Sequence, residues 1–141
     1  MAVDTPLIRD GGIMTANANF YNPGTPLNGP GGSGQFLALV ISASKVVSIA
    51  SSPTAGPIYG VLQNTPIAGE PCDIGILGVT KMVSGAAITA GAELMVDSSG
   101  RFVTWTAGAA NFKVGMCLET VAAINNVFSG LVYSPSYKVV T

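Results

Sequence analysis

The chain has 141 residues and a formal net charge of −1, and its 13 charged residues make up only 9% of it, where an ordinary soluble domain has roughly 25%. The length suggests one domain, and the six cations stand singly along the chain, which argues against a nucleic-acid partner because a phosphate backbone requires clustered cations. The sequence has no histidine, which removes the commonest general base and the commonest metal ligand.

Residues 1–35 are expected to form an extended arm. Four of the nine prolines fall in this stretch, and proline removes a backbone donor and fixes φ, which excludes a regular helix or a central strand. The arm ends in the glycine-rich run 29–34, and the alternative reading is a disordered terminus. Its apolar side chains are the candidates for contact with a partner protein or a neighbouring subunit: Ile8, Ile13, Met14, Phe20, Tyr21 and Leu27.

Residues 36–141 read as one β domain. Turn signals recur about every 8–12 residues, which favours a single small antiparallel β-barrel or sandwich of about seven to nine strands. No segment has the apolar spacing, the length and the caps of a long helix. The expected strands cover residues 36–41, 45–49, 58–62, 73–83, 93–96, 101–105, 112–118 and 127–133.

Two local signals stand out within this domain. The polar loop 97–100 ends in glycine between two apolar runs, which is a good hairpin signal. Gly75 and Gly78 interrupt the strand expected over 73–83, and glycine inside a strand often marks a bulge or a tight corner.

The residues that could support chemistry are sparse. Cys72 and Cys117 lie in apolar stretches, so buried thiols are expected, although spacing alone leaves a disulfide open. Glu70 and Asp73 flank Pro71, and solvated loop carboxylates are a better reading than a glycosidase pair. We predict no enzyme, and no catalytic, cofactor-binding or metal-binding residues.

Membrane attachment is not expected either. The N-terminus lacks a basic head followed by an apolar run, so no signal peptide is predicted. The longest apolar stretch, residues 36–41, is too short to cross a bilayer.

The order of motifs from Tyr59 to Tyr133 is more informative than any one of them. They are Tyr59-Gly60-Val61, Ala68-Gly69-Glu70 before the strand 72–79, the run 86–91, the hairpin 94–102, the segment 114–119 and a last strand ending near Val132. In this order and spacing they resemble the small capsid decoration, or cement, proteins of tailed bacteriophages. The resemblance covers a little over half of the chain and leaves residues 1–35 unmatched.

The resemblance implies a β-barrel, closed by the strand at Val114 and Gly115, that sits on the outside of an icosahedral capsid. It implies a homotrimer whose partner is the major capsid protein, a location on the virion surface, and no catalysis. Bound across a junction between capsomers, such a protein would add its binding free energy to the cost of opening the shell. The low charge fits this function, because charged residues are depleted at interface cores.

Three alternatives come from other classes of protein. A receptor- or glycan-binding module would use Trp105 and the tyrosines to stack on a sugar. A hydrolase of an unfamiliar kind would need a strongly perturbed carboxylate in a pocket. A tail or fibre subunit would polymerise head-to-tail. Under the decoration reading, deleting residues 1–34 is expected to leave the barrel folded and to weaken attachment.

Overall fold

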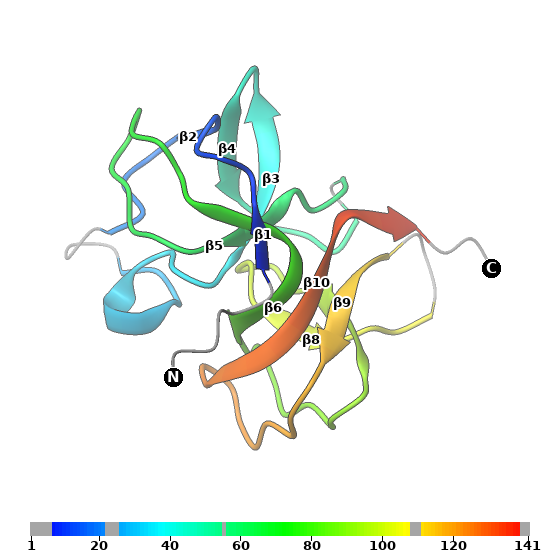
Figure 1. Cartoon of the computed structure of the whole chain (residues 1–141). Coiled ribbons are helices and arrows are strands. Elements are labelled where there is room, and N and C mark those ends of the chain that lie inside the picture. The colour runs from blue at the N-terminus through cyan, green and yellow to red at the C-terminus, as the bar shows by residue number, and fades with distance from the viewer. Residues whose placement is uncertain (1–6, 22–25, 55, 108–110, 139–141) are drawn as a thin grey trace, which may run out of the picture.

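The computed structural model describes residues 7–21, 26–54, 56–107 and 111–138, with the backbone alone from 134 to 138. Its described secondary structure is all β, as the sequence predicted, apart from one 3-10 turn at Pro30–Gly32 (Figure 1). The ten strands are β1 Leu7–Arg9, β2 Thr15–Ala16, β3 Ala38–Ala43, β4 Val46–Ile49, β5 Gly60–Leu62, β6 Ile74–Val83, β7 Glu93–Val96, β8 Phe102–Thr104, β9 Phe112–Cys117 and β10 Val127–Lys138. All eight strands expected after residue 35 are therefore present.

The long strand β6 lies in the middle of the sheet and joins its two halves. It pairs antiparallel with β1, β5 and β10, and Figure 1 shows it curving past β1 and running beside β10. Gly78, in the middle of β6, has a φ of 122°, which a residue with a side chain rarely adopts. The glycine signal within this strand thus corresponds to an unusual backbone conformation at which the strand can bend.

The sheet is open and sandwich-like, which is one of the two architectures that the sequence predicted, and it does not form the closed barrel that the family resemblance implied. Its strand order is β2-β4-β3-β5-β6-β10-β9-β7-β8, with β1 on β6. The strand expected to close a barrel, β9, instead lies inside the sheet between β10 and β7. Ser84, just after β6, makes one isolated bridge to Phe102 of β8. The half of the sheet formed by β6, β10, β9, β7 and β8, called the curled half below, therefore approaches closure without forming a ladder.

Two apolar clusters form the core. The larger includes Met82, Leu94 and Phe102, all completely buried, and extends to β3 and β5. The smaller lies under the other half and includes Leu39, Val47 and Ile74. Alternation along the strands sends these side chains inward and leaves their neighbours on the outer face.

The described part of residues 1–35 packs onto the sheet. β1 pairs with β6, and β2 runs parallel to β4. Met14, Ala16 and Phe20 belong to the smaller core cluster. Deleting residues 1–34 would remove these three side chains from the core, so we now expect that deletion to destabilise the domain.

Candidate docking surface

The described residues contain no cluster suited to metal chemistry or nucleophilic catalysis. No three His, Cys, Asp or Glu among them are placed to hold a metal ion. Cys72 and Cys117 are buried and free, so they form no disulfide. Burial raises the pKa of the Cys72 thiol to about 11 and also raises the pKa of Cys117, which disfavours the reactive thiolate.

No described helix is long and apolar enough to span a membrane.

The two acidic residues around Pro71 have separate structural partners. Glu70 Oε1 accepts a hydrogen bond from the Ile67 N–H at 2.9 Å, which braces the loop. The Asp73 carboxylate forms an ion pair with Arg9 of β1. Each carboxylate therefore stabilises local structure.

The six candidate contact residues of the N-terminal region fall into two groups. Three face this chain's own core: Met14, Phe20 and Leu27. The other three are exposed by 51–61%: Ile8, Ile13 and Tyr21. A contact with another protein can use only the second group without disturbing the fold.

Ile8 belongs to a row of apolar side chains that crosses three strands. It lies opposite Leu77 of β6, and Leu77 lies opposite Tyr133 of β10. Directly opposed residues of antiparallel strands project from the same face of a sheet. Ile8 and Leu77 are 56% and 46% exposed, so this row is open to contact.

A second row runs parallel to the first. Val79 lies opposite Leu131, and Leu131 lies opposite Met116 of β9. Val79 is two residues from Leu77 and therefore lies on the same face of β6. All three are partly buried. We define the outer apolar face as Ile8, Leu77, Val79, Met116, Leu131 and Tyr133.

This face differs from the usual exposed side of an antiparallel sheet, which is polar. None of its six residues carries a charge, and Lys81, opposite Ser129 in the next row, lies at its margin. Contiguous apolar patches rimmed by polar residues mark interaction sites, and charge is depleted at the cores of interfaces. The outer apolar face therefore has the composition of a docking surface.

Sequence reasoning found Ile8 but missed the other members of this face. A signal was present in β6, because apolar residues occupy both even-numbered and odd-numbered positions and so point to both faces of the strand. Ile74 and Met82 are buried, whereas Leu77 and Val79 lie on the outer face. A continuous apolar run predicts a strand covered on both faces. Only the register shows which residues share the uncovered face.

Trp105, the candidate sugar platform, is already engaged. Lys113 Nζ lies 4.4 Å from the centre of its ring and also contacts Glu93 Oε1 at 2.9 Å. The indole N–H donates to the Asn111 carbonyl at 3.2 Å. One face of the ring is therefore covered by a paired lysine.

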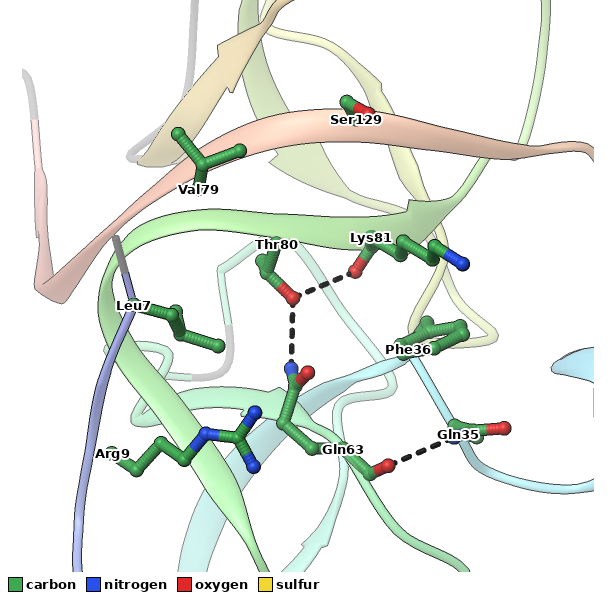
Figure 2. A pocket seen from close by; sticks show the side chains of 9 residues that line it. All are labelled: Leu7, Arg9, Gln35, Phe36, Gln63, Val79, Thr80, Lys81 and Ser129. Atoms are coloured by element: carbon green, nitrogen blue, oxygen red, sulfur yellow. Dashed lines mark hydrogen bonds between the residues drawn. The ribbon is translucent and has the colours of Figure 1, made fainter. Parts of the chain in front are cut away.

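A cavity of about 330 Å³ opens beside the outer apolar face at the edge of β6. Its polar side is held by hydrogen bonds, since Gln63 Nε2 donates to Thr80 Oγ1 at 2.8 Å and Gln35 Nε2 donates to the Gln63 carbonyl at 2.8 Å. Figure 2 shows these side chains with Arg9 and Phe36 around the cavity.

An open all-β fold with an uncharged outer face defines a class of structural domain suited to assembly with other proteins. The phage cement protein family matches residues 33–132, and the chain belongs to that family. It is therefore a structural component of a phage virion, associated with the capsid, as the motif order predicted.

A solved structure shows a similar fold. It is the N base of the head fibre protein gp8.5 of bacteriophage phi29, with a TM-score of 0.61 and 14% sequence identity, covering 89% of this chain and 95% of that one. The comparison with curated proteins gave no match.

Proposed function

We propose that the chain binds the outside of an icosahedral phage capsid at the junctions between capsomers and stabilises the shell there without catalysing a reaction. The observation that carries this proposal is the outer apolar face, which is uncharged and spans β1, β6, β10 and β9 in a member of the cement family. Because a cement protein attaches to a shell, the major capsid protein is the occupant that we assign to this face.

The surface is large enough for such a contact. A standard interface buries about 800 Å² on each partner, which is about 12% of the 6725 Å² that the chain exposes. A junction bridged in this way opens only if that contact breaks, so the binding free energy adds to the cost of opening. As a homotrimer, the protein would make several such contacts at once, and linked contacts raise the effective concentration of each other.

Binding to empty shells of the phage that carries this chain tests the proposal. The double variant Ile8→Lys/Leu77→Lys places two charges in the outer apolar face at exposed positions, where the fold tolerates them. We expect it to bind shells about tenfold or more weakly than the wild type in co-sedimentation, because charges in an interface core must be desolvated. Shells decorated with the variant should lose the thermal stabilisation that the wild type gives.

Ile41→Lys is the matched control. Ile41 is 58% exposed but lies on β3, outside the outer apolar face. This variant should bind shells like the wild type. The proposal fails if the double variant, folded by circular dichroism, binds and stabilises shells as well as the wild type.

The likeness to the base of a phage head fibre supports a second candidate function, in which the chain anchors or builds a fibre. Electron microscopy of decorated shells separates the two functions. A decoration protein forms compact knobs at capsomer junctions, whereas a fibre subunit extends outward in a head-to-tail array.

A further inference from the structure

One edge of β6 has no strand partner beyond Gly78 among the described residues. The last pair with β1 within the described ranges joins Leu7 to Gly78. On the other edge, β10 continues to Val83. The stretch Val79–Lys81 is thus paired on one side and borders the cavity on the other.

The direction of the backbone groups along this edge follows from two hydrogen bonds. The Ser84 N–H donates to the Asn126 carbonyl on the β10 side at 2.9 Å, and the Val83 N–H donates to the Phe36 carbonyl at 3.3 Å. Because these groups alternate sides along a strand, Val79 and Lys81 direct their N–H and C=O groups away from β10. No described strand pairs with these groups, so we take them as able to bond to an added strand.

The cavity beside this edge is pre-formed. Gln63 Nε2 donates one hydrogen bond to the Val61 carbonyl and one to Thr80 Oγ1. Thr80 Oγ1 donates in turn to the Lys81 carbonyl at 3.1 Å. That carbonyl retains a second lone pair for another donor. Figure 2 shows Thr80, Gln63 and Gln35 joined along one side of the cavity.

Phe36 lines the same cavity in an unfavourable backbone conformation. Its φ is 67°, a value that is a genuine outlier for a bulky residue. Its N–H donates to the Leu62 carbonyl at 2.7 Å, which helps to hold it there. Residues held in such conformations cluster at ligand clamps and active sites.

The cavity is positively charged. Arg9 and Lys81 line it, and none of its nine lining residues is acidic. Arg9 has Asp73 as its partner. Lys81 Nζ lies 6.0 Å from the centre of the Phe36 ring, and within the described part of the chain no carboxylate reaches salt-bridge distance of it. A bound carboxylate would supply the missing counter-charge.

We propose that this edge binds an extended segment of the major capsid protein as an added strand, with an Asp or Glu of that segment against Lys81. The inference rests on the proposed function and names the kind of segment that is bound. Strand addition draws affinity from main-chain hydrogen bonds and specificity from side-chain pockets. Val79 belongs to both the cavity and the outer apolar face, so the two surfaces form one continuous footprint.

Charge reversal at Lys81 tests the ionic contact. Lys81→Glu should weaken binding to empty shells by about tenfold or more, because an attractive pair becomes a repulsive one. Lys45→Glu is the matched control, since Lys45 is also exposed and without a carboxylate partner among the described residues but lies in the turn before β4. It should leave binding unchanged. Equal binding by Lys81→Glu and the wild type overturns the inference while leaving shell attachment intact.

Photo-crosslinking identifies the occupant. With benzoylphenylalanine in place of Phe36, irradiation of decorated shells should join the cavity to an extended capsid-protein peptide that contains Asp or Glu. A crosslink to residues 1–6 of the same chain, or to a second copy, overturns the inference. If the wild type does not bind shells at all, the proposed function fails and this inference fails with it.

Discussion

Cys72 is a buried thiol whose ionisation the fold opposes. Burial, followed by the charge of Asp10, raises its pKa from 9.0 to about 11. Between these values the folded state keeps a proton that the unfolded chain releases, so unfolding is favoured as the pH rises. We expect the free energy of unfolding to fall from about pH 9 to about pH 11.

Urea unfolding in a reducing buffer across this range measures the effect. Cys72→Ala should show a shallower fall, because it removes one of the titrating groups. The raised pKa of Cys117 leaves part of the slope in place. Identical pH slopes for Cys72→Ala and the wild type would contradict the assignment to Cys72.

At the scale of single residues, sequence predicted which side chains are apolar but not which of them are exposed. Phe20 and Tyr21 are adjacent aromatics, and both were expected to contact a neighbour. Phe20 is 2% exposed and Tyr21 is 51% exposed. The difference arises from contacts with residues distant in the chain, such as the hydrogen bond from Phe20 N–H to the Pro66 carbonyl. The local composition does not predict such contacts.

At the scale of elements, strands of the central region were predictable and those of the N-terminal region were not. β6 and the first part of β10, residues 127–133, are rich in apolar residues and follow turn residues, and such segments predict strands directly. The extension of β10 to Lys138 through a Ser-Pro-Ser segment was not predicted. β1 and β2 have only three and two residues. Their pairing joins Leu7 to Gly78 and Thr15 to Val46. It therefore depends on tertiary contacts, and the proline-rich composition of this region does not predict a strand there.

The buried aromatic of this region tests whether residues 7–21 belong to the folding unit. Phe20→Ala should lower the free energy of unfolding by about 3–5 kcal/mol, as for other buried phenylalanines. Tyr21→Ala, the exposed neighbour, should change it by no more than about 0.5 kcal/mol. Denaturant unfolding of both variants provides the measurement. Similar small losses for both would show that the N-terminal region contributes little to the folded domain.

At the scale of the whole molecule, sequence predicted an all-β domain but could not decide between a closed barrel and an open sheet. Closure depends on strand number, tilt and register together, and these are set by pairs such as Leu94 with Gly115. The single bridge between Ser84 and Phe102 shows how near the curled half comes to closure. The same register sets the outer apolar face, so that face was equally out of reach of sequence reasoning.

The assembly state is the last expectation to test. A closed trimer has one size at all concentrations, because its symmetric contacts are used up on closure, whereas a head-to-tail contact that does not close yields a growing filament. Sedimentation of the purified chain should therefore give one species of three times the 14.2 kDa chain mass across concentrations. The Ile8→Lys/Leu77→Lys variant should form the same species, because the outer apolar face is assigned to the capsid. Dissociation of that variant into monomers would instead assign the face to the contact between copies, and growth of the wild type with concentration would favour the fibre function.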